Sequence, residues 1–292
     1  MNEEVFGYYQ DAGKIAKRVL EFGRGEVRKG ARIADVVEKI ENRVTEGEGA
    51  GLAFPLNLSL NEDAAHDTAM ISEERTFSAG DVVKLDLGVH IEGYIADIAT
   101  TADLGNHEPL LEASRAALNA AIERVHPGIA AGEIGAVIQE SIESRGFRPI
   151  ANLTGHGLNR YAIHVPPTIP NLRINGGAVL KEGMVFAIEP FATTGSGMVG
   201  ERKRVEIFQQ IGVKPARSPA ARKILSLIRD RRGMPFAKRW VRADKMDMAL
   251  LALVQTHALH PYPVLHDIPG SLVSQAEHTL IMTSDGCVVT TR

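Results

Sequence analysis

Two aspartates in one predicted hairpin are the first residues whose surroundings suggest chemistry. Asp86 and Asp97 lie in the β-rich runs VVKLDLGV and GYIADIATT, which are joined by the turn-like HIEG. Each stands where a core strand would carry an apolar residue, and an ionised carboxylate there is costly unless it is compensated. A lone aspartate of this kind is often a turn cap or a water-facing residue on an edge strand. Two across one hairpin favour a pair of carboxylates directed at a cation.

Three further ionisable residues stand in strand-like contexts. His156 lies in TGHG, Glu189 ends the apolar run MVFAIEP, and Glu277 lies in SQAEHTLIM. Singly, each is explained as a loop histidine or a solvent-exposed strand end. Together with the two aspartates they form a set of oxygen and imidazole ligands without sulfur, which suits divalent Mn, Fe, Co or Zn. Five ligands exceed one mononuclear site, but bridging carboxylates would let them hold two ions.

The composition excludes several classes of protein. The 292 residues are 44% hydrophobic and 24% charged, as is ordinary for a soluble globular protein. The N-terminus has no signal-peptide pattern, and no apolar run approaches the roughly 18 residues of a membrane helix. The single cysteine, Cys287, excludes an internal disulfide and argues against a thiolate metal site. These features predict a cytoplasmic protein.

The elements that must position these residues form a repeating pattern. Apolar periodicity predicts two pairs of amphipathic helices whose matching positions are offset by 101 to 103 residues. The four helices are expected at residues 4–22, 33–44, 108–125 and 132–145. The offset suggests an internal duplication of a helix, helix, strand unit, with a cleft between two related halves. Chance agreement between two amphipathic helix pairs is the alternative.

The second half adds extended runs and a basic segment. Strands are expected within residues 149–158, 160–171, 184–195, 274–283 and 287–291. Between residues 202 and 245, fourteen Lys and Arg stand against three acids, so the segment carries a net charge of +11. Amphipathic helices are expected there at 218–232 and 243–259. The charge fits either a solvated helical face or a surface that follows phosphates.

The order of these motifs resembles one family, the type II methionine aminopeptidases, in their short archaeal form. The resemblance runs over nearly the whole chain and includes GLAFPLNLSLNEDAAH, the hairpin, LTGHGLNRYAIHVPPTIPN, VFAIEPFATTGSG and HPYPVLHDIPGSLVSQAEHTL. It implies an α+β pita-bread fold, in which two pseudo-twofold halves surround a dimetal cleft. Residues 1–292 would form a single catalytic domain, with an inserted helical subdomain at 200–262.

The resemblance also implies roles for the metal ligands. Asp86 would chelate one ion, His156 and Glu189 would hold the other, and Asp97 and Glu277 would bridge the two. The cofactors would be two divalent ions: Co, Mn, Fe or Zn. A water acidified by these ions would attack the carbonyl of the first residue of a nascent polypeptide, with Glu189 as the proton carrier.

Further residues match family positions around the substrate. His164 would donate to the developing oxyanion, and His66 would contact the scissile amide and help the leaving amine. Phe54, Ile163 and Tyr262 would line the pocket for the methionine side chain; as bare apolar residues they would be ordinary core. The sequence departs from the family at the residue after His66, where an aspartate, Asp67, replaces the usual aromatic.

Two other readings stay open beside hydrolysis of the initiator methionine before a small second residue. One is a peptidase of the same fold directed at Xaa-Pro bonds, such as a prolidase, although those carry a sizeable N-terminal domain. The other is a non-catalytic relative that binds RNA or the ribosome, although such relatives lose metal ligands that are all present here. The basic segment 202–245 adds the hypothesis that the enzyme approaches the ribosome, and the family implies a monomer.

Overall fold

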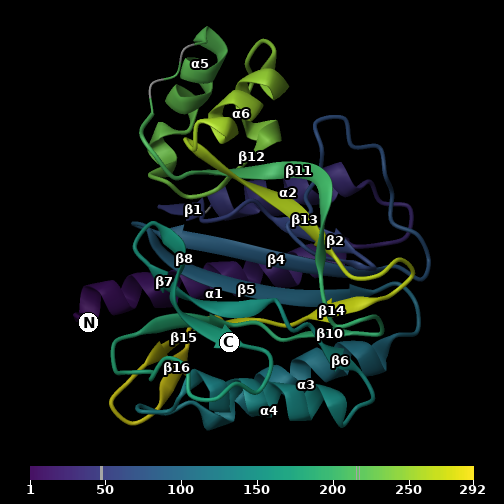
Figure 1. Cartoon of the computed structure of the whole chain (residues 1–292), viewed down its shortest axis with the longest axis vertical. Coiled ribbons are helices and arrows are strands. Elements are labelled where there is room, and N and C mark those ends of the chain that lie inside the picture. The colour runs from purple at the N-terminus through teal and green to yellow at the C-terminus, as the bar shows by residue number, and fades with distance from the viewer. Residues whose placement is uncertain (47–48, 215, 217) are drawn as a thin grey trace.

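The computed structural model describes residues 1–46, 49–214, 216 and 218–292 (Figure 1). The glycine-rich residues 45–51, which follow the second expected helix, lie partly outside the described residues. Arg217, one cation of the basic segment, also lies outside them. Within the described chain, no helix is both long enough and apolar enough to span a membrane.

The predicted hairpin is the centre of the first half. Strands β4 (Val82–Ile91) and β5 (Tyr94–Asp103) pair antiparallel over their full length. Glu92 and Gly93 both have positive φ, at 51° and 86°, as a two-residue type I′ turn requires. The other edge of β4 pairs with β1 (Ala50–Leu52) and β2 (Asn57–Leu60). The hairpin therefore lies inside a sheet, where its apolar residues are buried.

Two helices cover this sheet. Helix α1 (Glu3–Glu26) begins at Asn2, whose side chain accepts a hydrogen bond from the Val5 N–H at 2.9 Å. Helix α2 (Ile33–Thr45) buries its predicted apolar face. Their side chains and those of the sheet form one hydrophobic core, in which Ile33, Ile40, Leu85 and Leu87 are fully buried. The first half is thus a helix pair on a hairpin sheet.

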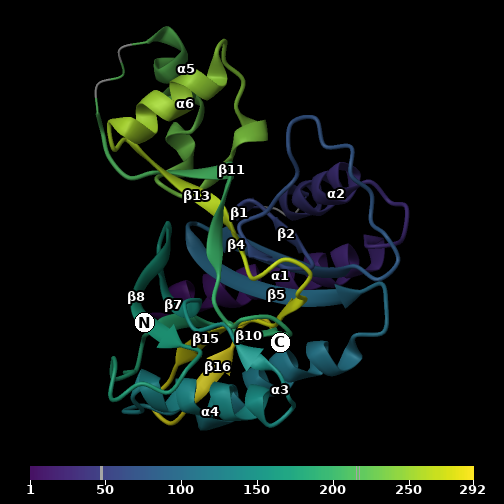
Figure 2. The same ribbon diagram turned by 45° about the vertical axis from the view of Figure 1, so that its right-hand side comes forward.

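The second half repeats this arrangement around its own core. Helices α3 (Glu108–Arg124) and α4 (Ala131–Glu143) pack against strands of the C-terminal half (Figures 1 and 2). One sheet has the order β16 (Cys287–Val289), β15 (His278–Met282), β9 (Val185–Ile188), β7 (Thr154–Asn159), β8 (Ala162–Pro170). A smaller one has the order β14 (Val273–Gln275), β10 (Phe191–Thr193), β6 (Arg148–Pro149). The separate cores of the two helix pairs agree with the predicted duplication.

Residues 200–262 begin and end in strands, with the helices between them. Strand β11 (Gly200–Gln210) pairs with β12 (Phe236–Ala237) and with β13 (Leu259–His266), which pairs with β3 (Asp63–Ala65). Helices α5 (Pro219–Leu227) and α6 (Met246–Gln255) carry their own hydrophobic core and stand apart from the body in Figure 2. Both helices are shorter than predicted. Helix α5 is followed by turn η1 (Arg229–Arg231) and by Arg232 at φ 51°. The last residue predicted for the second helix, Leu259, belongs to β13 instead.

Several cations of the basic segment bind acids of the body. Arg202 pairs with Glu62 and Asp63, and Arg239 pairs with Glu41. Arg231 is turned inward, where its guanidinium lies 5.1 Å from the Trp240 ring centroid. Burial lowers the pKa of Arg231 to about 10. Part of the charge of the basic segment therefore anchors it to acids of the body.

Candidate metal centre and active site

Asp86 and Asp97 project from the same face of the hairpin. Asp86 pairs with Ala99 and Asp97 with Gly88, and the even spacing along each strand gives both side chains one orientation. The Thr279 hydroxyl holds the backbone of Asp97, because it accepts from the Asp97 N–H at 2.7 Å and donates to the Asp97 carbonyl at 2.8 Å. The hairpin therefore delivers two carboxylates to one place.

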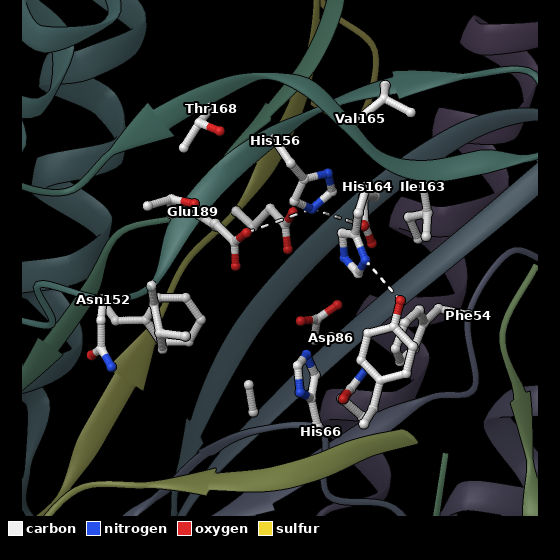
Figure 3. A pocket seen from close by; sticks show the side chains of 18 of the residues that line it. Phe54, His66, Asp86, Asn152, His156, Ile163, His164, Val165, Thr168 and Glu189 are labelled. Carbon is white, nitrogen blue, oxygen red and sulfur yellow. Dashed lines mark hydrogen bonds and ion pairs between the residues drawn. The ribbon is translucent and has the colours of Figure 1, made fainter. Parts of the chain in front are cut away.

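The other three predicted ligands reach the same place from the second half (Figure 3). His156 lies on β7, Glu189 follows β9, and Glu277 lies between β14 and β15. The Nε2 atom of His156 is 3.5 Å from Glu189 Oε1 and 3.8 Å from Asp97 Oδ2. One ligand atom each of Asp97, His156 and Glu277 lies within 4.8 Å of the other two.

The hydrogen bonding of His156 leaves one nitrogen available to a metal. Its Nδ1 lies 3.3 Å from the Gly157 carbonyl oxygen, which can only accept, so Nδ1 carries the proton. Nε2 is then the unprotonated nitrogen, and it faces the carboxylates. Burial lowers the pKa of His156 to about 4, which keeps the ring neutral near pH 7. A neutral imidazole fixed in this way is the form that ligates metals.

Gln275 is a site residue that sequence reasoning missed. Its Nε2 donates to Asp86 Oδ2 at 3.0 Å and lies 3.5 Å from Glu189 Oε2. The amide thus bridges two carboxylates that come from different halves of the molecule. Strand alternation from Glu277 would have placed residue 275 on the same face, and this was the available signal.

Four carboxyl groups in one cleft cannot all ionise without compensation. Burial raises the pKa of Asp86 to about 6. Burial and the neighbouring Asp86 carboxylate raise the pKa of Asp97 well above its ordinary value. Burial and the other acids raise the pKa of Glu189 and Glu277 in the same way. The site accepts either protons or cations.

The donor set fits divalent cations. Asp97 Oδ1 and both carboxylate oxygens of Glu277 are buried and have no hydrogen-bond partner in the described part of the chain. Buried polar atoms without partners are rare in folded proteins, and an ion is one of the few ways to satisfy them. With Asp86, His156 and Glu189 they offer the oxygen and imidazole ligands that Mn, Fe, Co and Zn accept.

A cleft of about 440 Å³ opens over these groups. Apolar and aromatic side chains form one wall, and the predicted pocket residues Phe54, Ile163 and Tyr262 all line it. The Phe54 and Tyr262 rings meet edge to face with centroids 5.2 Å apart. His66 and His164 also line the cleft. Predicted ligands and predicted pocket residues are therefore brought together in one cavity.

His66 is held in an unusual backbone conformation. Its φ is 62°, a region that few residues other than glycine adopt, and such strain concentrates at functional sites. Burial lowers the pKa of His66 to about 4. Nδ1 of His66 is buried and finds no hydrogen-bond partner among the residues described. The ring is therefore neutral near pH 7, and its Nδ1 atom lacks a hydrogen-bond partner among the described residues.

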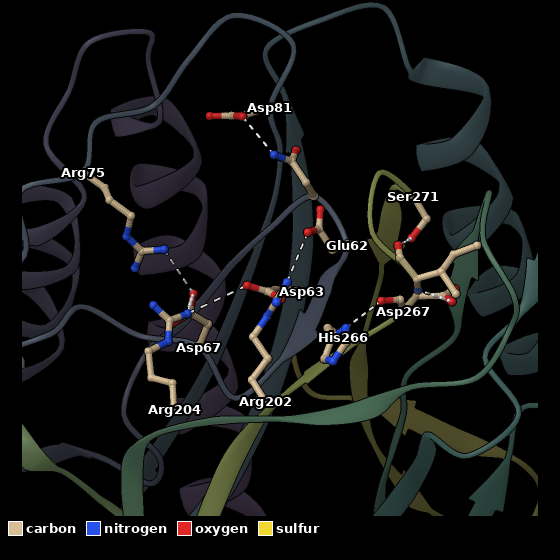
Figure 4. A network of polar contacts seen from close by, with 12 residues as sticks. Glu62, Asp63, Asp67, Arg75, Asp81, Arg202, Arg204, His266, Asp267 and Ser271 are labelled. Carbon is tan, nitrogen blue, oxygen red and sulfur yellow. Dashed lines mark hydrogen bonds and ion pairs between the residues drawn. The ribbon is translucent and has the colours of Figure 1, made fainter.

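An ion-pair network fixes the residue after His66 (Figure 4). Asp67 is fully buried, and its carboxylate lies 2.6 Å from the Arg204 guanidinium and 3.6 Å from that of Arg75. Arg204 is in turn 3.8 Å from Asp63. Because Arg204 belongs to β11, the network ties the loop of His66 to the strand that opens residues 200–262. This accounts for an aspartate where the resemblance predicts an aromatic residue.

Replacing Arg204 by methionine should lower the free energy of unfolding by about 3 kcal/mol, because the buried Asp67 carboxylate loses the closer partner of its ion pairs. The activity that the family resemblance implies, release of methionine, should fall as well, because the Asp67 carboxylate next to His66 loses its closest partner. Chemical denaturation and peptide hydrolysis measure the two effects. Arg202→Met is the matched control, since it spares Asp67. Equal losses in both variants would contradict the role assigned to Arg204.

Comparison with known proteins agrees with this geometry. Residues 7–215 match the family model described as metallopeptidase family M24. The chain is 47% identical over 293 residues to a methionine aminopeptidase of Archaeoglobus fulgidus, with 100% of both chains covered.

Solved structures agree as well. A thermophilic Arx1 superposes with a TM-score of 0.88 at 20% identity, over 99% of this chain and 91% of the other. A methionine aminopeptidase from Thermotoga maritima superposes with a TM-score of 0.74 at 24% identity, over 100% and 98%. These two likenesses speak for the fold alone, and the predicted pita-bread fold is confirmed.

Proposed function

The chain belongs to metallopeptidase family M24 and, within it, to the methionine aminopeptidases of the archaeal type, and from this premise we propose how its cleft works. It is a metallo-aminopeptidase that removes N-terminal methionine. We propose that it acts on nascent polypeptides with a small second residue and uses two divalent ions. The supporting observation is that Asp97 and Glu277, with buried oxygens that have no hydrogen-bond partner among the described residues, lie close to the neutral His156.

The five ligands divide between the two ions in this proposal. Asp86 would hold one ion, His156 and Glu189 would hold the other, and Asp97 and Glu277 would contribute to both. Ions bound there supply Lewis acidity, which polarises the carbonyl and lowers the pKa of water. Gln275 orients Asp86 and Glu189 through its amide hydrogens. Its role resembles that of the outer hydrogen bonds that commonly orient metal ligands.

Glu189 also moves a proton in this proposal. Its carboxylate accepts the proton of the attacking water and passes it to the leaving amine. When no cation compensates it, burial and the neighbouring acids raise the pKa of the Glu189 carboxyl. His66 and His164 flank the peptide bond and contact its polar atoms.

The apolar wall selects the side chain. Phe54, Ile163 and Tyr262 accept the methionine, whose flexible thioether makes favourable contacts with aromatic rings. We also propose that the enzyme is a monomer, as the family resemblance implies. Nascent chains as substrates imply action in the cytoplasm.

Peptide hydrolysis by metal-stripped protein tests the proposed function. The protein is re-supplied with Mn, Fe, Co or Zn and given Met-Ala-Ser or Ala-Pro-Ser. We expect release of methionine from the first peptide alone, only with metal, and the rates rank the four ions. Cleavage before proline would assign the chain to the Xaa-Pro-directed peptidases. Absence of turnover with every ion would instead favour a non-catalytic binding protein.

We also propose that exposed cations of the segment 202–245 bring the enzyme to the ribosome. Lys223, Arg229 and Arg232 are exposed on and beside α5, unlike Arg231, which is turned inward. Cations on an exposed helical surface can contact phosphates in RNA.

Changing Lys223, Arg229 and Arg232 to glutamate should reduce co-sedimentation with ribosomes at low salt, because the contact is electrostatic. The same change at Arg18, Arg24 and Lys29, which are exposed in and after α1, is the matched control for total charge. Equal sedimentation of both triple variants and the parent would contradict ribosome contact through this surface.

A further inference from the structure

A chain of hydrogen bonds connects His164 to a backbone carbonyl outside the cleft. His164 Nδ1, on β8, lies 3.2 Å from the Tyr262 hydroxyl, on β13. That hydroxyl donates to Gln209 Oε1, on β11, at 2.7 Å. Gln209 Nε2 donates to the Gly233 carbonyl oxygen, just before β12, at 2.9 Å. The chain therefore connects β8 to residues 200–262, which contain Tyr262, Gln209 and Gly233.

The Gly233 carbonyl, at the end of this chain, determines the direction of every hydrogen bond in it. A carbonyl oxygen only accepts, so the Gln209 amide must turn its nitrogen to Gly233 and its oxygen to Tyr262. An amide oxygen also only accepts, so the single hydroxyl proton of Tyr262 points at Gln209. The hydroxyl then offers a lone pair to His164, and Nδ1 of His164 must be the donor. A neutral imidazole has one N–H, which leaves Nε2 unprotonated.

We propose that Gln209 is a positioning residue that, through Tyr262, fixes the proton of neutral His164 on Nδ1 and leaves Nε2 as a hydrogen-bond acceptor in the cleft. His164 then accepts a hydrogen bond from an N–H of the substrate and does not donate to its carbonyl oxygen. This reverses the direction implied by the family resemblance, in which His164 donates to the oxyanion. The consequence for the substrate rests on the proposed function, whereas the tautomer does not.

Nitrogen NMR of the imidazole rings tests the tautomer directly. The full-length protein is labelled with ¹⁵N-histidine, loaded with diamagnetic Zn²⁺ and held at pH 8, above the ordinary pKa of histidine of about 6.5. The signals of His164 are identified by their loss in His164→Asn. We expect Nδ1 to resonate as a protonated ring nitrogen and Nε2 as an unprotonated one.

Substitutions at Gln209 test its part in the relay. In Gln209→Met the Tyr262 hydroxyl is free to donate to Nδ1, so the proton of His164 should move to Nε2. Gln209→Glu keeps an oxygen for the Tyr262 hydroxyl and should retain the original tautomer. Gln210→Met is the matched control, because the Gln210 amide donates elsewhere, to the Gly212 carbonyl at 3.4 Å.

The kinetic readout follows the spectroscopic one. Gln209→Met should lower kcat/KM for Met-Ala-Ser about fivefold, the effect of one neutral hydrogen bond, and Gln209→Glu should restore most of it. A proton on Nε2 in the parent protein, or an unchanged tautomer in Gln209→Met, would overturn the proposal. Because the spectra require no turnover, an inactive protein with the expected tautomer would count against the proposed function alone.

Discussion

Glu277→Gln should reduce methionine release by more than about a hundredfold, the upper end of the loss seen when a residue that only supports a metal ligand is removed. Both carboxylate oxygens of Glu277 are buried and unpartnered among the described residues, and the side chain lies within ligand distance of Asp97 and His156. An amide keeps the shape of the side chain but offers one oxygen and no charge. The loss should appear in kcat and in the metal concentration needed for activity.

A buried glutamate elsewhere is the matched control for Glu277. Glu206, on β11, is buried, and burial raises its pKa too. It is not one of the described residues that line the cleft. Glu206→Gln should therefore leave metal-dependent release of methionine close to that of the parent. Activity of Glu277→Gln within a few-fold of Glu206→Gln would contradict a metal-bridging role for Glu277.

Asp86→Asn should stabilise the metal-stripped protein at pH 8 while it abolishes activity. Asp86 has a folded-state pKa of about 6 against an ordinary value of 3.8, so the folded chain binds its proton more tightly than the unfolded chain. Stability from this group is complete below pH 3.8 and is lost as the pH rises through about 6. The full loss above that range is about 3 kcal/mol. Asparagine stays neutral and avoids it.

Chemical denaturation at pH 4 and pH 8 measures this effect. The advantage of Asp86→Asn over the parent should be about 3 kcal/mol at pH 8 and should disappear near pH 4. Bound metal should remove the advantage, because a cation compensates the parent carboxylate and cannot bind the variant in the same way. An equal advantage at both pH values would show that the ionised Asp86 is not the source of the cost.

The central hairpin could be predicted because its evidence is local. Alternation and β-branched residues define the two strands, and the turn residues Glu92 and Gly93 fix the register. That register alone places Asp86 and Asp97 on one face. The helices were equally accessible from apolar periodicity, and their ends moved by a few residues where strands or turns follow. Strand-like contexts singled out His156, Glu189 and Glu277 as candidate ligands, whereas their individual roles and the pocket residues came from the family resemblance.

Other features escaped prediction because they depend on contacts between distant segments. Strand β11 reads as a charged segment, since Arg202 and Arg204 look solvent-exposed until their acidic partners near residue 63 are in place. Arg231 likewise reads as a surface cation, but it stacks on Trp240. Nothing in the sequence singles out Gln209, because its importance depends on the folded positions of Tyr262 and Gly233, the hydrogen-bond partners of its amide.

These long-range contacts also link residues 200–262 to the cleft. Arg204 pairs with Asp67, the residue after His66, and Gln209 accepts a hydrogen bond from Tyr262, which contacts His164. Strand β11 is therefore linked to both histidines through one residue in each case. Residues 200–262 therefore support His66 and His164, the two histidines that line the cleft and are not predicted metal ligands. Substitutions that break these contacts should therefore lower the catalytic rate more than they lower the affinity for metal.

Titration of metal-stripped protein with Mn²⁺, with bound metal and methionine release followed together, tests the dimetal centre most directly. The proposal predicts two ions per chain, release of methionine from Met-Ala-Ser that rises with their binding, and loss of both in Glu277→Gln. Release of methionine by fully stripped protein, or unchanged metal binding and activity in Glu277→Gln, would contradict it.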